Sequence, residues 1–167
     1  GDVALDIDGI AGILRKAAEE GRTLLTEVEA KAVLARCGME VPETIHCLDE
    51  EQVEATAVRM LKDVPRIVVK MLSKRITHKS DVGGVVLDLV TPESARAAAS
   101  YIRSRFDRVH PGVGLDGFTV QPMVKRKAGR ELIAGLATDP TFGPVVVFGA
   151  GGTSVEVVGD TAVGIVP

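Results

Sequence analysis

A lysine interrupts an apolar run of β-branched residues, and cations and glycines follow it closely. Lys70 lies inside RIVVKML, where a buried strand would carry only apolar side chains. The polar stretch 73–82 (SKRITHKSDV) then places His78 among basic residues, and Gly83 and Gly84 come next. A lysine in such a strand either reaches solvent at a sheet edge or meets an anion. Because glycine amides can approach phosphate oxygens closely, the combination favours a phosphate-binding site.

Neither of the two usual glycine signatures of nucleotide sites occurs in the context that it requires. It contains no GxxxxGK[ST] segment, which excludes a Walker A loop. The spacing GxGxxG occurs once, at 112–117 (GVGLDG), between a predicted helix and a predicted strand. Because the dinucleotide fingerprint follows a strand and opens a helix, this segment is not that fingerprint. The segment GAGG at 149–152 has two open interpretations: it binds an anion through its backbone amides, or it only turns the chain.

A second candidate segment, GFTVQPMV at 117–124, resembles a strand interrupted by proline. Pro122 has no N–H, so ladder pairing is expected to fail there. Backbone donors and acceptors from Gln121 to Val124 would then be available to an adenine edge, which needs one of each. The alternative is an edge strand that ends at a bulge. Glu131 follows and either accepts ribose hydroxyls or pairs with a nearby basic side chain.

Composition and charge narrow the class of protein. The chain has 167 residues, is 46% hydrophobic and carries a net charge of −3. Residues 1–63 hold 14 acidic against 7 basic residues, whereas residues 64–135 hold 13 basic against 6 acidic residues. The basic middle of the chain suggests an anionic ligand. The alternative, which accounts for the charge distribution equally well, is a charged face that only contacts solvent. With aromatic residues at only 3%, stacking platforms for nucleic acid are largely missing, so no nucleic-acid partner is expected.

Three amphipathic helices are predicted in the first 65 residues. The first contains Ile10–Ala18 at helical spacing and stops at Gly21. The second starts at a capping box of Thr26 and Glu29, and Gly38 ends it. After a short strand at 41–48, a third helix starts at Asp49 and carries an apolar stripe.

From residue 65 the pattern changes to strands, at 66–72, 85–90, 117–124, 131–137, 145–148 and 155–158. A helix at 91–106, with Thr91 as its cap, separates the second and third of them. Because only one helix separates these six strands, hairpins should dominate over parallel crossovers. The predicted class is α+β, with mainly antiparallel sheets flanked by helices.

The order of these segments resembles the ATP-grasp domain of the ADP-forming (NDP-forming) acyl-CoA synthetases, which are related to the succinyl-CoA synthetase β subunit. The resemblance covers residues 22–167. It rests on LTEVEAKAVLARCGMEVPE, IVVKMLSKRITHKSDVGGVVLDL, GFTVQPMV, GRELIAGLATDPTFGPVVVFGAGGTSVEVVGD and AVGIVP, in that order. HKSDVGGV and DPTFGPVVVFGAGG are its most specific parts. The implied organisation is an N-terminal helix or linker at 1–21 and an ATP-grasp domain at 22–167.

The resemblance implies roles for individual residues. Lys70 would contact the nucleotide, and the loop that includes Gly83 and Gly84 would cover the phosphates. The hinge from Gln121 to Val124 would read adenine through the carbonyl of Pro122 and the amide of Val124. Glu131 would hold the ribose, and His78 would carry a phosphoryl group transiently. Separately from the resemblance, Mg²⁺ is assigned to the late acids Glu156 and Asp160, whose alternative is that they are turn residues next to GAGG.

The implied activity is the interconversion of acyl-CoA, ADP and phosphate with acid, CoA and ATP. A phosphohistidine on a CoA-binding domain, of the same or a partner chain, would relay phosphate to the ATP/ADP site. That domain and the family's downstream segment are not recognisable, so the C-terminal lobe is expected to be incomplete. The alternative is a regulatory synthetase-like domain of a GNAT-type protein acetyltransferase. Two cysteines and no apolar run of membrane length indicate a cytoplasmic protein without a membrane partner.

Overall fold

The computed structural model describes residues 5–76, 83–124, 132–150 and 161–165. The chain divides into two compact units, residues 1–124 and 125–167, which are described separately. The first unit contains α1 (Ile7–Glu19), α2 (Glu27–Arg36), β1 (Ile45–Cys47), α3 (Glu50–Met60), β2 (Ile67–Leu72), β3 (Val85–Leu89), α4 (Pro92–Val109) and β4 (Gly117–Pro122). The second contains β5 (Leu132–Asp139), β6 (Gly143–Ala150) and β7 (Thr161–Ile165).

The helices begin at the caps that the sequence predicts. At the start of α2, the Glu29 N–H donates to Thr26 Oγ1 at 3.3 Å, and the Thr26 N–H donates to Glu29 Oε2 at 2.7 Å. Asp49 caps α3, and Thr91 caps α4 with proline in its first turn. The caps satisfy N–H groups that have no partner inside the helix. The prediction of a helix at 91–106 is confirmed, although α4 continues to Val109.

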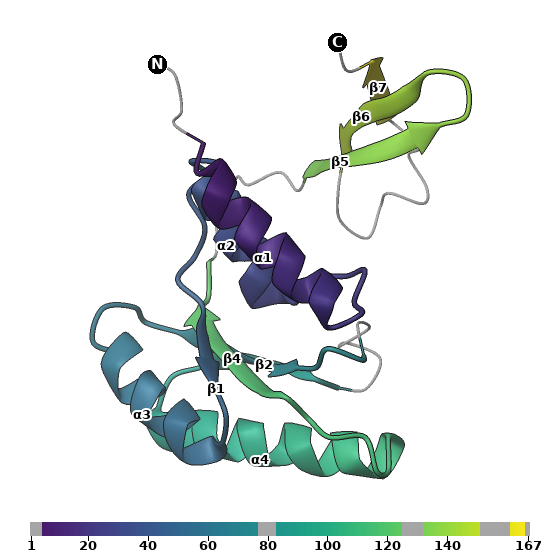
Figure 1. Ribbon diagram of the computed structural model, residues 1–167. Coiled ribbons are helices and arrows are strands. Elements are labelled where there is room, and N and C mark those ends of the chain that lie inside the picture. The colour runs from purple at the N-terminus through teal and green to yellow at the C-terminus, as the bar shows by residue number, and fades with distance from the viewer. Residues whose placement is uncertain (1–4, 77–82, 125–131, 151–160, 166–167) are drawn as a thin grey trace. The chain divides into compact units, whose positions relative to one another are not determined.

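The first unit is built on an antiparallel sheet with the strand order β1-β4-β2-β3. Figure 1 shows α3 and α4 on one side of this sheet and the α1–α2 pair on the other. The core lies between the sheet and α3–α4. Its fully buried members include Val53, Ala57, Ile67, Val69, Met71, Ala95, Ala99, Ile102, Phe106, Phe118 and Val120. One face of β2 is therefore fixed against α3–α4, which leaves its other face for different contacts.

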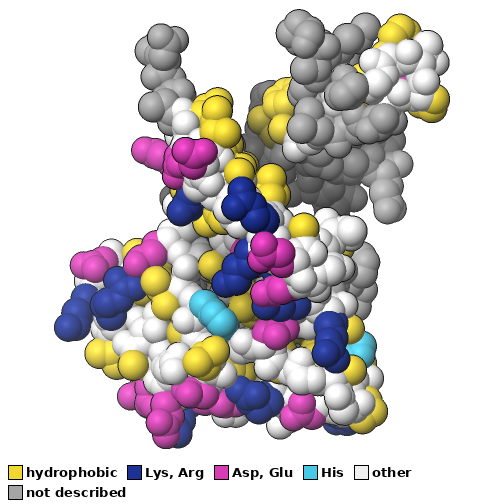
Figure 2. Space-filling view, viewed as in Figure 1, with side chains coloured by type: hydrophobic (Ala, Val, Ile, Leu, Met, Phe, Trp, Pro, Cys, Tyr) yellow, Lys and Arg dark blue, Asp and Glu magenta, His cyan; other side chains and the backbone are white. Residues whose placement is uncertain are grey.

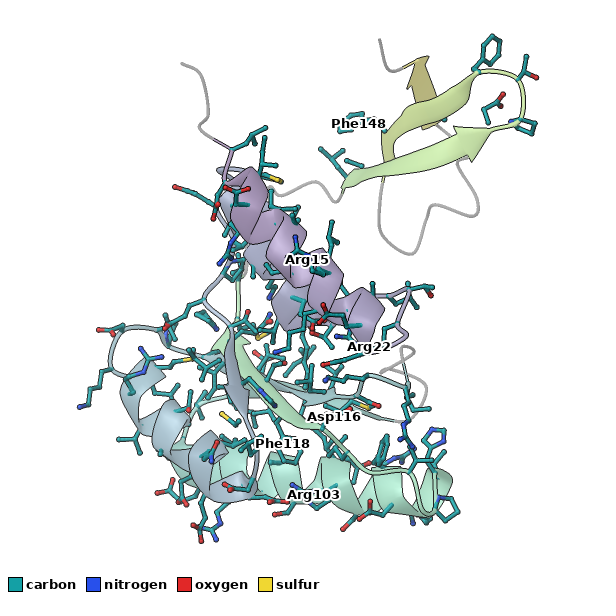
Figure 3. All side chains as sticks on the ribbon, in the orientation of Figure 1. Arg15, Arg22, Arg103, Asp116, Phe118 and Phe148 are labelled. Atoms are coloured by element: carbon teal, nitrogen blue, oxygen red, sulfur yellow. The ribbon has the colours of Figure 1, made fainter. Side chains whose placement is uncertain are left out.

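Arg103 of α4 connects the helical layer to the sheet. Its guanidinium carbon lies 5.0 Å from the centre of the Phe118 ring, and both residues are labelled in Figure 3. The same side chain donates to Glu50 Oε1 at 2.6 Å and holds the pKa of that carboxyl below its usual range. Arg103 thus uses one charged group to cover the aromatic ring and to pair with a carboxylate in the first turn of α3.

Pro122 is accommodated in the sheet, so the prediction that pairing fails there is wrong. Pro122 lies in register with Ile67, and the Met123 N–H donates to the Arg66 carbonyl at 2.9 Å. Residues of an antiparallel strand alternate between their two neighbours, so Pro122 turns away from β2 on the side of β1. Since β1 pairs only with residues 118–120, the missing N–H costs no ladder bond.

The second unit is an antiparallel sheet with the order β5-β6-β7. β5 and β6 are joined by a turn in which Asp139 Oδ1 accepts the N–H groups of Thr141 and Phe142 at 2.8 and 3.0 Å. In the GAGG segment, Gly149 and Ala150 belong to β6, so the turn interpretation is wrong for these two residues; residues 151 and 152 lie outside the described residues. Pairing of Gly149 with strands on both sides keeps it extended.

The strand predictions for the end of the chain did not locate β7. β7 was not predicted, and the predicted strand at 155–158 lies outside the described residues. Every strand pair in the described ranges is antiparallel, which confirms the α+β class. Among the described helices, none has the length and apolarity needed to cross a membrane.

Candidate functional site

Lys70 occupies an inner strand, which excludes the sheet-edge interpretation. β2 pairs with β4 on one side and β3 on the other, so Lys70 is not at a sheet edge. Its strand neighbours on the opposite face are buried in the core: Val69 and Met71. The Lys70 ammonium instead donates to Glu27 Oε1 at 2.8 Å, and the two side chains are 22% and 20% exposed. A partly buried lysine on an inner strand is suited to an anionic ligand, which its remaining N–H groups can reach.

Two residues of α2 connect Lys70 to the predicted hinge. Lys31 lies one turn after Glu27 and contacts the same oxygen, Oε1, at 3.2 Å. The Lys31 ammonium also donates to Gln121 Oε1 at 2.7 Å and to Thr44 Oγ1 at 2.8 Å. The structure therefore brings Lys70 and Gln121 together on one face of the sheet, through a network that is partly shielded from solvent.

The register of β2 and β4 explains this juxtaposition. Lys70 lies opposite Thr119, and Gln121 is two residues further along β4. Such diagonal neighbours have Cα atoms roughly 7–8 Å apart on the same face of a sheet. Thr119 itself is fully buried, and its hydroxyl has no hydrogen-bond partner among the described residues. A buried polar atom without a partner is uncommon and is often found at functional sites.

The glycine pair before β3 has a left-handed backbone at Gly83 and a hydrogen bond to β2 at Gly84. Gly83 has φ +65°, and a Cβ atom there would lie 2.9 Å from Arg105 Nε of α4. Gly84 is buried, and its carbonyl accepts the Met71 N–H at 2.7 Å. Glycine is required at residue 83 because its backbone is left-handed and a side chain would meet the arginine. The pair therefore ends the polar loop beside the strand that carries Lys70.

The start of that polar loop is also fixed. Ser73 Oγ accepts the N–H groups of Arg75 and Ile76 at 3.2 and 3.1 Å. The Lys74 N–H donates to Asp116 Oδ2 at 2.7 Å. Next to it lies a cavity of about 300 Å³, lined by Gly21, Arg22, Thr23, Leu24, Lys74 and Arg75. Both ends of the loop are thus anchored, at residues 73–76 and at residues 83–84.

Ion pairs already compensate much of the charge around this cavity. Figure 2 shows basic and acidic side chains interleaved on the face that it displays. Glu20 contacts both Arg22 and Lys74, at 2.9 and 2.8 Å. Arg22 also donates two hydrogen bonds to Glu29, at 2.7 and 2.9 Å, which lowers the pKa of Glu29 to about 2. Arg22 therefore joins the end of α1 to the capping box of α2.

Several predicted site residues lie outside the described residues. These are His78, Glu131, Glu156 and Asp160. Within the described ranges, no group of three or more His, Cys, Asp or Glu side chains is placed to hold a metal ion. The structure therefore brings together Lys70 with Gln121, and it places Gly83 and Gly84 at the end of the adjoining loop.

The sequence analysis missed three residues of this face: Glu27, Lys31 and Thr119. Glu27 and Lys31 have the i, i+4 spacing of a helical ion pair, which was a usable signal. That spacing could not reveal the strand residues that they contact, since residue 31 contacts residue 121. Thr119 alternates with Phe118 and Val120 along β4, which assigns it to the face opposite the core.

Comparison with known proteins identifies the family of the chain. The family model for the ATP-grasp domain matches residues 16–167. The β subunit of acetate–CoA ligase (ADP-forming) I from Pyrococcus furiosus is 37% identical over 156 residues, which are 93% of this chain and 64% of that protein. Acetate–CoA ligase (ADP-forming) II from Archaeoglobus fulgidus is 35% identical over 145 residues, covering 86% of this chain and 20% of that protein. The chain thus spans about 64% of the Pyrococcus subunit.

Solved structures give the same result. Acetyl-coenzyme A synthetase 1 of Candidatus Korarchaeum cryptofilum, in complex with coenzyme A and Ca-AMPCP, matches with a TM-score of 0.84 and 36% identity. The match covers 93% of this chain and 66% of that one. A second structure of that enzyme contains Mg-AMPPCP, with its phosphohistidine segment pointing towards the nucleotide site. It matches with a TM-score of 0.73 and 34% identity, over 95% of this chain and 64% of that one. Our chain belongs to the ATP-grasp family and is homologous to the ADP-forming acetyl-CoA synthetases.

Proposed function

We propose that this chain is the nucleotide-binding part of an ADP-forming acyl-CoA synthetase. The complete enzyme would interconvert acyl-CoA, ADP and phosphate with a carboxylic acid, CoA and ATP. The homology to ADP-forming acetate–CoA ligases supports this reaction class. The observation that carries the proposal is Lys70: a lysine on an inner strand, facing away from the core, with one of its three N–H groups on Glu27.

Lys70 would donate its remaining N–H groups to nucleotide phosphate oxygens. A charged hydrogen bond of this kind is worth about 1.5–3 kcal/mol when it is shielded from solvent. Gly83 and Gly84 lie at the end of the adjoining loop, and their position supports a role over the phosphates. Since a side chain at residue 83 would meet Arg105, backbone amides are the groups that this turn can offer.

The adenine base would bind at the hinge. The alternation along β4 turns the carbonyl of Pro122 away from β2, beyond the end of β1. That carbonyl would accept from the adenine amino group, and the Val124 N–H would donate to a ring nitrogen. Gln121 borders the same position, and Glu131 would accept the ribose hydroxyls.

His78 would carry the phosphoryl group between the CoA-binding part and ADP. The neutral imidazole nitrogen attacks the phosphorus of the incoming phosphohistidine; a new N–P bond forms as the donor N–P bond breaks. An oxygen of the ADP β-phosphate then attacks the same phosphorus, which releases His78 and yields ATP. Lys74 and Arg75 begin this loop and would offset the transferring charge. Mg²⁺, with Glu156 and Asp160 as its proposed ligands, would supply further charge neutralisation at the phosphates.

Nucleotide titration of the full-length protein tests the proposal. Calorimetry with ADP, ATP and GDP should show binding of at least one nucleotide, and Lys70→Ala should weaken it about ten-fold or more. Lys62→Ala, which removes an exposed lysine after α3, is the matched control and should bind as the wild type does. Formation of ATP from acetyl-CoA, ADP and phosphate tests the reaction class. Absence of nucleotide binding by the wild-type protein would contradict the proposal.

A further inference from the structure

The Lys31 ammonium makes two hydrogen bonds and one ion pair at the hinge end of the proposed nucleotide face. A lysine has three N–H donors and no acceptor. Lys31 donates to Gln121 Oε1 at 2.7 Å and to Thr44 Oγ1 at 2.8 Å, and it forms an ion pair with Glu27 Oε1 at 3.2 Å. Thr44 in turn donates its hydroxyl hydrogen to the Pro42 carbonyl at 3.1 Å. Each group in this network therefore has a defined role as donor or acceptor.

This pattern fixes the orientation of the Gln121 amide. A side-chain amide has an acceptor branch, Oε1, and a donor branch, Nε2, and it can turn over when its partners allow either role. A group that only donates requires the oxygen. Lys31 therefore holds the Oε1 branch of Gln121 towards α2, and the Nε2 branch lies on the side away from Lys31.

Glu27 connects Lys31 to Lys70 in the same network. The two lysine nitrogens contact one oxygen, Glu27 Oε1, at 2.8 and 3.2 Å, so they lie within about 6 Å of each other. Two ammonium groups at this separation repel each other strongly in a partly buried site. The bridging carboxylate makes their coexistence possible, and thereby links the phosphate end of the face to the hinge end.

We propose that Lys31 is a positioning residue for the base subsite, acting through Gln121. This inference rests on the proposed nucleotide function. Adenine and guanine present opposite donor and acceptor patterns at their six-membered edge, so an amide of fixed orientation distinguishes them. Without Lys31 the Gln121 amide would turn freely, and discrimination between the two bases would fall. The phosphate end would keep its Glu27–Lys70 pair.

The test compares affinities of the full-length protein for ADP, GDP and inorganic pyrophosphate. Lys31→Met should reduce the affinity for the preferred nucleotide about five- to ten-fold and bring the ADP-to-GDP ratio closer to one. Pyrophosphate affinity should change less than two-fold. Lys31→Arg keeps a cationic donor and should recover most of the ratio. Lys16→Met, on the exposed side of α1, is the control and should change none of these values.

A double-mutant cycle with Gln121→Leu shows whether Lys31 acts through Gln121. The effect of Lys31→Met on the base ratio should disappear in the Gln121→Leu background. If the effect persists there undiminished, or if Lys31→Met lowers ADP, GDP and pyrophosphate affinity equally, the residue is only structural and the inference is wrong. If wild-type protein binds no nucleotide, the proposed function itself fails. Nucleotide binding that weakens in Lys70→Ala but keeps its base ratio in Lys31→Met overturns this inference alone.

Discussion

Lys74 and Asp116 join the start of the polar loop to the start of β4: the Lys74 N–H donates to Asp116 Oδ2 at 2.7 Å. The Asp116 N–H donates in turn to the Leu72 carbonyl at 3.1 Å, and the Asp116 carbonyl lies 2.9 Å from His46 Nε2. One aspartate thus anchors three segments of the chain. The loop that carries His78 therefore leaves the sheet from a fixed position.

Asp116→Ala should disturb this anchor. The change removes a charge-assisted hydrogen bond to a backbone N–H, so we expect a loss of about 1–2 kcal/mol in the free energy of unfolding. Phosphoryl transfer should also slow, because the loop loses its fixed start. Denaturant unfolding and ATP formation measure the two effects. Asp63→Ala, at an exposed acid after α3, is the control. Unchanged stability in Asp116→Ala would show that the hydrogen bond contributes nothing.

Lys70→Ala and Glu131→Ala test the nucleotide contacts in steady-state kinetics. Each should raise the KM for nucleotide or lower kcat by about ten-fold or more, since each removes a charged hydrogen bond worth on the order of 1–3 kcal/mol. The KM for acyl-CoA should change little, because these groups are assigned to the nucleotide. Normal nucleotide kinetics in both variants refute the assignment.

His78→Ala separates the two half-reactions. The variant should make no ATP from acyl-CoA, ADP and phosphate, because the proposed carrier nitrogen is lost. Phosphorylation of the histidine in the CoA-binding part should continue, since that step does not involve this loop. Radiolabelled phosphate on the full-length assembly, followed by gel separation of the chains or domains, measures both. Normal turnover of His78→Ala would assign the residue a structural role.

The Arg22–Glu29 pair should make stability depend on acid pH. The ordinary pKa of Glu29 is 4.5, and Arg22 lowers it to about 2 in the folded chain. A carboxyl whose pKa is lowered by folding stabilises fully above its ordinary value and loses that contribution as the pH falls through the folded value. We therefore expect the contribution to decline from about pH 4.5 to about pH 2.

Glu29→Gln gives the matched comparison for this effect. Glutamine preserves the capping geometry at the start of α2 but cannot ionise. The difference in unfolding free energy between wild type and Glu29→Gln should be largest near neutral pH and shrink below pH 4.5. Urea unfolding over a series of pH values measures this difference. A difference that stays constant from pH 7 to pH 2.5 contradicts the assignment of the ion pair.

Local sequence patterns determined most of the secondary structure. The caps at Thr26, Asp49 and Thr91 are satisfied within a few residues of the chain, so the sequence alone locates the starts of α2, α3 and α4. The β-branched runs likewise predicted β2 and β3. Gly149 was assigned to a turn because glycine is typical of turns, and β7 was missed because a five-residue segment carries a weak local signal. Pairing with the neighbouring strands decides the conformation of both.

The residues of the candidate site were likewise predicted only in part from the sequence. The sequence identified Lys70, because a charge inside an apolar run is visible locally, and Gln121, because it precedes a proline in a strand. It did not reveal Glu27, Lys31 or Thr119. Their significance depends on contacts with residues 43 to 90 positions away along the chain, or on burial in the folded sheet. Such contacts follow from strand order and from the packing of α2, which only the tertiary structure specifies.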